Sequence, residues 1–166
     1  MFQLRNRKTA VAALAATALA GTGLVGVVAS ADAAAKTATV QNLRTGAHST
    51  FDRVVIDYTG KKPTVKLSLV NSLYSCGKGD KLTIPGDKIL KIDLTPAQAH
   101  NDKGKSTYSG PGRLSTANYN LSTLKGVRMA CDFEGHVTFG VGVKNLKSYS
   151  VSHLTNPKRV VVDLKR

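Results

Sequence analysis

A short polar stretch contains the side chains in this sequence that are best suited to catalysis. Asp132, Glu134 and His136 alternate with other residues. On an extended strand this spacing would place all three on one face, where they could bind a metal ion or transfer protons. The solvent face of an ordinary strand has the same spacing, and Gly135 indicates a bend that would separate the three side chains. A small hydrolase is therefore the alternative hypothesis, and a non-catalytic protein the expected one.

Other common enzyme signatures are absent from the sequence. It contains no G-x-S-x-G nucleophile motif, no phosphate-binding loop, no H-E-x-x-H zinc motif and no dinucleotide-binding glycine pattern. Four histidines could serve in a nucleophilic triad, but no serine or cysteine is marked as their nucleophile. We expect no catalytic residue, no metal ion and no cofactor.

Arginines near the two ends of the folded chain are candidates for ligand binding. Arg53 precedes Asp57 by four residues, and Arg159 precedes Asp163 by the same interval. On adjacent strands these side chains could pair across the sheet. The two arginines could instead bind carboxylates or phosphates of a ligand. Cross-strand pairing is the favoured interpretation, and ligand binding is the alternative.

Three more candidate ligand-binding residues lie in or beside an irregular segment, residues 101–120, which is rich in Gly, Ser, Asn and Lys. They are His100, Tyr108 and Arg113. A segment of this length without its own periodicity is commonly functional or mobile. A tyrosine in such a segment is more often a half-buried ring with its hydroxyl in water than a ligand-binding residue.

The amino-terminal segment has the pattern of an export signal. Arg5, Arg7 and Lys8 precede an uncharged stretch, and the small residues that follow fit signal peptidase cleavage. We expect a signal peptide over residues 1–33, with an uncleaved membrane anchor as the alternative. Residues 34–41 are small and polar, and predict a flexible leader. The expected product is a secreted protein without a membrane span in its mature form.

The exported part is strongly basic. Residues 1–33 contain three of the 24 basic and one of the 10 acidic residues, so 21 basic and nine acidic residues remain, a net charge of +12. Such a charge favours anionic polymers or surfaces as partners, although it also serves to keep a small domain soluble and monomeric. The two cysteines, Cys76 and Cys131, both lie in this part, and an even count in an oxidising compartment predicts one disulfide.

The pattern of the exported chain predicts an all-β protein. Apolar residues alternate with polar ones over short segments that are separated by glycines and an Asn-Pro pair. The predicted strands are 51–58, 63–70, 81–84, 89–94, 137–143, 149–154 and 159–164. Thr95 and Pro96 suggest a single helical turn over 95–100. We expect a small β-sandwich or open barrel with one long irregular insertion.

Segments at both ends and in the middle of the chain resemble a known family. The segments 52–58 and 154–164 are similar to the paired strand motifs of AMIN domains, the non-catalytic targeting modules of periplasmic amidases. The segments 94–100, 108–114 and 132–142 narrow the resemblance to the AMIN-like domain of exported actinobacterial proteins. It covers roughly residues 40–165, and we assign the domain to residues 42–166. The resemblance implies a β-sandwich with a binding role at the cell envelope.

The leading hypothesis is a secreted AMIN-like module that associates with peptidoglycan or an anionic wall polymer. It would bind through basic residues and the 101–120 segment as a monomer, without specific nucleic-acid recognition. Two alternatives remain open: a secreted hydrolase using the Asp132, Glu134 and His136 cluster, and a secreted inhibitor or partner protein that presents the loop 110–113 to another protein.

Overall fold

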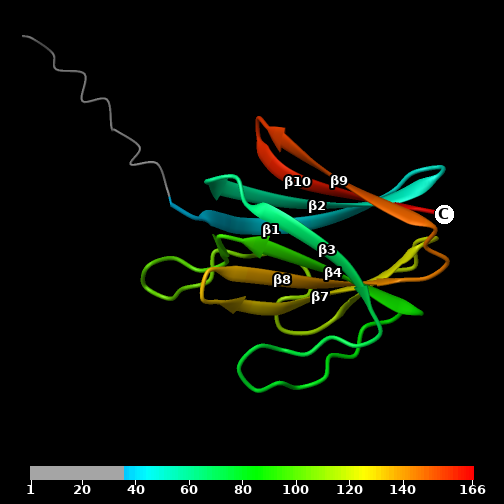
Figure 1. The fold of residues 1–166 in the computed structure, drawn as a ribbon, viewed down its shortest axis with the longest axis horizontal. Coiled ribbons are helices and arrows are strands. Elements are labelled where there is room, and N and C mark those ends of the chain that lie inside the picture. Colours follow the sequence, from blue (N-terminus) through cyan, green and yellow to red (C-terminus); the bar gives the residue numbers. More distant parts are fainter. Residues whose placement is uncertain (1–35) are drawn as a thin grey trace, which may run out of the picture. The chain divides into compact units, whose positions relative to one another are not determined.

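The computed structural model describes residues 36–166, and the expected signal peptide over residues 1–33 lies outside the described residues. The described chain is all-β (Figure 1), and its ten strands form two sheets. The predicted sandwich or open barrel is confirmed. The strands are β1 (Ala38–Ala47), β2 (Phe51–Gly60), β3 (Thr64–Val70), β4 (Lys88–Thr95), β5 (Ala97–Gln98), β6 (Ala117–Asn118), β7 (Leu124–Phe133), β8 (His136–Val143), β9 (Ser148–Thr155) and β10 (Lys158–Lys165).

Each sheet contains five strands. The first sheet has the order β5-β1-β2-β10-β9, and the second has the order β3-β4-β8-β7-β6. All neighbours are antiparallel except β1 and β5, which are parallel. The longest strands are β1, β2 and β7, with ten residues each, whereas β5 and β6 have two residues each. The outer edges of the sheets are therefore unequal, and β3 and β9 are their two long edge strands.

The core lies between the sheets and is formed by alternating residues of their strands. In β2, for example, Val54 and Ile56 are fully buried while Val55 between them is only partly so. Fully buried side chains from the second sheet include Leu90, Ile92 and Phe139. Burial of these alternating apolar rows is the main force that holds the two sheets together.

The outer face of the second sheet is covered by the connection between β3 and β4, residues 71–87, which we call the covering loop. Its Leu73 and Ile84 form a second buried cluster with Ile89 and Ala130 of the sheet. The loop packs closely on β8 at Gly140 and Gly142. Only glycine fits at position 142, since a Cβ there would overlap the carbonyl oxygen of Pro85.

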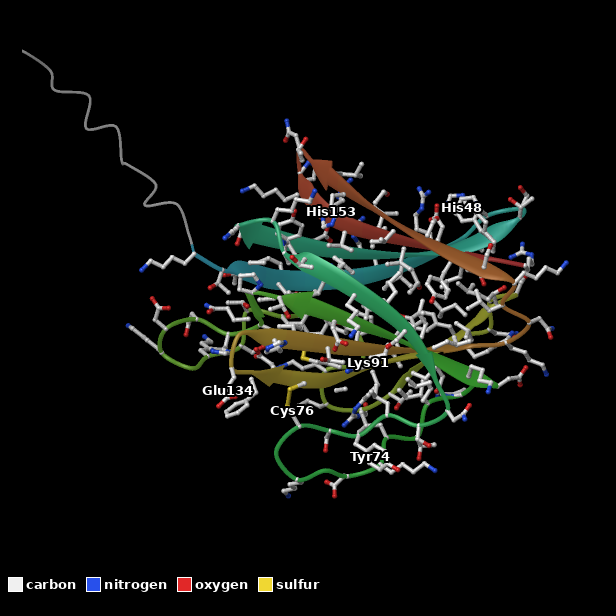
Figure 2. The ribbon with its side chains drawn as sticks, in the orientation of Figure 1. His48, Tyr74, Cys76, Lys91, Glu134 and His153 are labelled. Carbon is white, nitrogen blue, oxygen red and sulfur yellow. A yellow bond between two sulfur atoms is a disulfide. The ribbon has the colours of Figure 1, made fainter. Side chains whose placement is uncertain are left out.

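A disulfide fastens the covering loop to β7. Cys76 and Cys131 are bonded, with their Cα atoms 5.1 Å apart, so the predicted pairing is confirmed (Figure 2). The backbone N–H of Cys76 also donates to the carbonyl of Ala130, at 3.1 Å. The loop is therefore held to the sheet by the disulfide, by backbone hydrogen bonds at Cys76 and Asp87, and by a small apolar cluster.

Three local predictions were wrong. Residues 38–41, assigned to a flexible leader, begin β1, because Ala38 and Val40 are fully buried in the core. The segment 81–84 makes only an isolated bridge from Lys81 to Tyr74, since it lies in the covering loop. The segment 95–100 is extended rather than helical: Ala97 N–H donates to the carbonyl of Gly135, and β5 pairs with β1.

Candidate binding site

The acidic cluster of the hydrolase hypothesis lies in the hairpin that joins β7 to β8. Glu134 and Gly135 form its two-residue turn, both with positive φ, and Glu134 lies at its tip (Figure 2). His136 pairs with Phe133, so Asp132 projects from the opposite face. The three side chains do not have the alignment that the hydrolase hypothesis requires, because the turn interrupts the alternation at Gly135, where the sequence indicated a bend. Within residues 36–166, no group of three His, Cys, Asp or Glu side chains is placed to hold a metal ion.

Asp132 and His136 instead have separate structural partners. The Asp132 carboxylate accepts a hydrogen bond from Ala99 N–H, at 2.8 Å, and lies 2.9 Å from His100 Nδ1. His136 Nδ1 lies 2.9 Å from the hydroxyl of Thr95. His100, a predicted ligand-binding residue, is thus partly exposed but positioned by a carboxylate, and it anchors the start of the irregular segment on β7.

The predicted arginine and aspartate pairing is confirmed. Arg53 donates two hydrogen bonds to Asp163, at 2.7 and 2.9 Å, and the register places these residues opposite one another. These bonds lower the pKa of the Asp163 carboxyl below its usual value. Arg159 lies opposite Asp57 and donates from Nε, at 3.2 Å. A second arginine, Arg44, donates two bonds to the same Asp57. Ligand binding by Arg53 would have to break an intact bidentate pair.

Tyr108 belongs to the core rather than to a surface site. Its side chain is 2% exposed, its ring lies 5.4 Å from that of Phe139, and its hydroxyl donates to the carbonyl of Pro111. Burial raises the pKa of Tyr108 above its ordinary value. It therefore cannot contact a ligand on the surface. Arg113, five residues later, is exposed.

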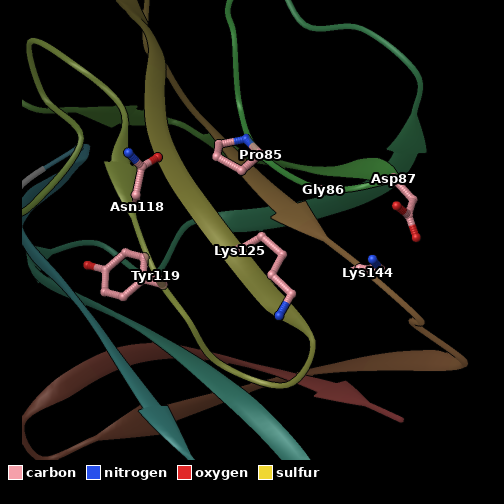
Figure 3. A pocket seen from close by; sticks show the side chains of 7 residues that line it. All are labelled: Pro85, Gly86, Asp87, Asn118, Tyr119, Lys125 and Lys144. Carbon is pink, nitrogen blue, oxygen red and sulfur yellow. The ribbon is translucent and has the colours of Figure 1, made fainter.

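A hollow of about 410 Å³ lies at one end of the second sheet, and the residues that line it are far apart in the sequence. Its lining comes from the end of the covering loop, the end of the irregular segment, the start of β7 and the residue after β8. The lining residues are Pro85, Gly86, Asp87, Asn118, Tyr119, Lys125 and Lys144, as Figure 3 shows.

Backbone contacts fix the walls of this hollow. Asp87 N–H donates to the carbonyl of Val143, Tyr119 N–H donates to that of Lys125, and Lys144 N–H donates to that of Thr123, each at 2.8 Å. Gly126 leaves the room in which the ring of Pro85 packs, since a Cβ there would lie 2.7 Å from Pro85 Cδ. The hollow is therefore preformed by paired backbone rather than by mobile side chains.

The chemistry of the hollow suits an anionic or hydroxyl-rich ligand. Lys125 and Lys144 contribute two ammonium groups, and Asp87 and Asn118 contribute exposed oxygen and amide groups. Ammonium groups attract carboxylates and phosphates, whereas amide and carboxylate oxygens accept hydrogen bonds from hydroxyls. The Lys125 ammonium also donates to the carbonyl of Leu121, which holds it at the rim.

The surface outside the hollow is also positively charged. Among the ion pairs of residues 36–166, the arginines account for most, and Lys91 is the only lysine that takes part. Three of the eight aspartates of the described residues pair with arginines, and the lysines other than Lys91 form no ion pair there. The basic character predicted from composition is thus carried mainly by lysines outside ion pairs, of which Lys88, Lys125 and Lys158 each donate a hydrogen bond to a neutral oxygen.

Sequence reasoning missed most of this hollow. The sequence predicted binding by the 101–120 segment, which contributes Asn118 and Tyr119, and by basic residues in general. It did not single out Lys125, Lys144 or the covering loop. No local pattern connects these positions, because they meet only through the pairing of β6, β7 and β8. The one available signal was the Pro-Gly-Asp turn at residues 85–87.

Fold and site together define a small all-β module with a preformed basic hollow and no assembled metal cluster in the described chain. The family model of the AMIN-like domain matches residues 38–166. The chain therefore belongs to the AMIN-like domain family, as its sequence motifs predicted. No curated protein and no solved structure matches it.

Membership in this family sets the broad role of the chain. AMIN-like domains are typically non-catalytic targeting modules, and the family indicates a module associated with the cell wall. Together with the disulfide, it also indicates a location at the cell envelope. No helix in residues 36–166 has the length and apolar content that crossing a membrane requires.

Proposed function

We propose that the chain is a secreted, non-catalytic module that binds an anionic polymer of the cell wall, either peptidoglycan or a polymer attached to it. The observation that carries this proposal is the hollow between β6, β7 and the covering loop, with Lys125 and Lys144 at its rim. Wall peptides carry carboxylates and attached wall polymers carry phosphates, and both fit two ammonium groups set beside hydroxyl-binding side chains.

Arg159 and Arg113 are secondary contacts in this proposal. Arg159 uses only Nε in its bond to Asp57, which leaves its other donors for a ligand. Arg113 is exposed in the irregular segment. His100 remains available through the ring nitrogen that does not face Asp132. Arg53 is assigned a structural role, because both of its bonds go to Asp163.

The test is retention on insoluble peptidoglycan, prepared with and without its attached anionic polymers, at 0.1 M and 1 M salt. Replacing Lys125 and Lys144 together by Gln should lower the association constant about tenfold, since each exposed charged contact contributes up to about 1 kcal/mol. The matched control replaces Lys61 and Lys62 by Gln, because it removes the same charge from exposed positions in the turn between β2 and β3, away from the hollow.

The two variants separate specific from general attraction. A loss confined to the Lys125 and Lys144 variant supports the hollow as the site. Equal losses in both variants, with retention that disappears at 1 M salt, would reduce the association to unspecific charge attraction, because the Debye length falls from about 10 Å to about 3 Å over that range. Absence of retention on either material would refute the proposal.

A further inference from the structure

Two arginines of the described chain have no acidic partner. Residues 36–166 contain six arginines, and four of them form ion pairs with aspartates. The other two, Arg113 and Arg128, take part in none of the ion pairs of these residues. They are 15 residues apart in the sequence, but the fold brings their backbones together at the β6 side of β7.

Arg128 lies on the face of the second sheet that the covering loop covers. It pairs with Gly140, and a Cβ at Gly140 would meet Leu73 and Ile84 of that loop. Because opposite residues of an antiparallel pair share a face, the Arg128 side chain also projects toward the loop. Its Nε is buried without a hydrogen-bond partner among the described residues. Buried polar atoms are nearly always bonded, so this Nε indicates an acceptor that comes from outside the chain.

The acidic strand residue on the same face does not neutralise Arg128. This residue is Asp93 on β4, two strands away from β7. Its carboxylate accepts a hydrogen bond from the Thr138 hydroxyl, at 2.7 Å, and lies 3.0 Å from the Lys91 ammonium. The guanidinium of Arg128 therefore keeps its full charge in a partly buried position, where water and salt screen its attraction for an anion less than at an open surface.

Two contacts hold a short exposed loop, residues 113–115, beside Arg128. Before the loop, the carbonyl of Gly112 accepts a hydrogen bond from Met129 N–H, at 2.6 Å. After it, the Thr116 hydroxyl donates to a carbonyl of the covering loop, at 2.7 Å. All three residues between these contacts are exposed. Arg113, the first of them, is thus attached to the sheet one residue away from Arg128.

Close backbone packing fixes the start of this loop. Gly112 has a φ of 76°, and a Cβ there would lie 2.5 Å from the carbonyl oxygen of Val127. A Cβ at Gly110 would lie 2.6 Å from the hydroxyl oxygen of Tyr108, and this hydroxyl donates to the carbonyl of Pro111. The buried tyrosine and the two glycines therefore position the loop rather than bind a ligand themselves.

The donors gathered here fit a phosphate group better than a carboxylate. The backbone N–H groups of residues 113–115 donate to no backbone acceptor among the described residues, and successive free amides of this kind bind anions. A planar carboxylate presents both of its oxygens to one guanidinium, whereas a tetrahedral phosphate presents oxygens in several directions. Two guanidinium groups on different segments, together with free amides, therefore match a phosphate.

We propose that Arg113, Arg128 and the amides of residues 113–115 form a phosphate-binding site. Arg128 supplies the partly buried fork, and Arg113 closes over the bound group from the exposed loop. None of these residues lines the hollow, so the site stands apart from it. The proposal rests on the proposed function only for the source of the phosphate, which is a phosphate-bearing polymer of the wall rather than its peptides.

The test titrates the full chain, as processed by the expressing cell, with a short glycerol phosphate oligomer. An oligoglutamate of equal charge is its control, and glycerol 3-phosphate and acetate are the corresponding small probes. Calorimetry should show the phosphate oligomer binding at least about tenfold more tightly than the oligoglutamate. In NMR spectra that resolve arginine side chains, the Nε–H signal of Arg128 should shift downfield, together with the amide signals of residues 113–115.

Conservative substitutions separate the fork from the charge. Arg128→Lys keeps the charge but loses the fork, and should weaken binding of the phosphate oligomer about tenfold. Arg113→Lys should weaken it about threefold, and its exposed position leaves the fold intact. Lys61→Gln removes an exposed charge elsewhere and should leave the affinity unchanged. Thermal melting verifies that each variant is folded.

The site is refuted if the Arg128 signal stays in place at saturation, if oligoglutamate binds equally well, or if both lysine variants bind like the unaltered chain. Shifts confined to Lys125 and Lys144 would assign the phosphate to the hollow, which overturns this site and supports the proposed function. Conversely, the double Gln variant of the hollow should retain the Arg128 shift.

A further arm distinguishes the source of the phosphate. Leu114, in the same loop, is 80% exposed and could enter the surface of a membrane. Binding to phosphatidylglycerol vesicles without binding to the oligomer, and its loss in Leu114→Ser, would keep the phosphate site but overturn the wall polymer as its ligand. Binding to the oligomer that Leu114→Ser does not change supports the polymer.

Discussion

Asp52 is the residue through which β2 reaches the second sheet. Its side chain is completely buried, and Oδ2 accepts hydrogen bonds from the N–H groups of Thr123 and Leu124, at 2.6 and 2.9 Å. Arg166 approaches the other oxygen at 3.3 Å, and also donates to two carbonyls of the turn before β2. One carboxylate thus satisfies the first amides of β7 and positions the carboxyl-terminal residue, since buried polar groups require such partners.

Replacing Asp52 by Ala should lower the free energy of unfolding by about 2 to 4 kcal/mol. The substitution leaves two backbone donors and a guanidinium without their acceptor, and each unsatisfied buried group costs about 1 to 3 kcal/mol. Urea unfolding followed by circular dichroism measures the change. Asp102→Ala, at an exposed position, is the control and should be nearly neutral. A similar small effect at Asp52 would show that the carboxylate does not join the sheets.

Among the strands, β8 is packed on both faces, because it contacts the core on one side and the covering loop on the other. Val137, Phe139, Val141 and Val143 fill the core, while Gly140 and Gly142 leave space for the loop. The alternation of large and absent side chains is the reason that a strand with so many glycines can lie at the centre of a sheet. This alternation also fixes the position of the covering loop, and therefore of one wall of the hollow.

Gly142→Ala should destabilise the protein by about 1 to 3 kcal/mol, the usual cost of overpacking. The added methyl group would meet backbone atoms of Pro85, which cannot move without moving the loop. Gly140→Ala should cost less, because the added methyl group meets only side-chain ends, those of Leu73, Ile84 and Ile89. Gly46→Ala meets nothing within 4 Å and is the control. Denaturant unfolding measures the stability, and equal values for Gly142→Ala and Gly46→Ala would contradict this account.

The success of sequence reasoning differed between elements for physical reasons. β2, β4 and β10 were predicted because their apolar alternation is strong. β1 was assigned in part to a leader because its buried positions include Ala38 and its exposed ones are small and polar. The extended segment at 95–100 was mistaken for a helical turn because Thr-Pro is also a helix start, whereas its true partners, β1 and the β7–β8 turn, are distant in sequence.

At the scale of the whole molecule, the disulfide connects the loop that covers one face to the sheet beneath it. The two cysteines are separated by 55 residues. The segment between them contains β4, β6 and most of β7, three of the five strands of the second sheet, whereas β3 and β8 lie outside it. The same bond therefore restricts the unfolded chain and holds the covering loop in the folded one.

The double variant Cys76→Ser, Cys131→Ser should lose about 4 kcal/mol of unfolding free energy, the chain-entropy value for a loop of this length. Guanidinium unfolding measures the loss, and limited proteolysis should cut the variant within the covering loop before the sheets unfold. Adding a reductant to the unaltered protein should reproduce the value, whereas the variant itself should not respond. Unchanged stability would show that the loop and sheet are held by packing alone.

The position of the covering loop also has a consequence for when the protein becomes active. Residues 85–87 form one wall of the hollow, and the loop that carries them is fastened by a bond that forms only under oxidising conditions. A newly made chain in a reducing cytoplasm would hold this wall less firmly than the finished one. Under the proposed function, the hollow would thus reach its final form only after export, so that polymer precursors inside the cell would meet an unfinished site.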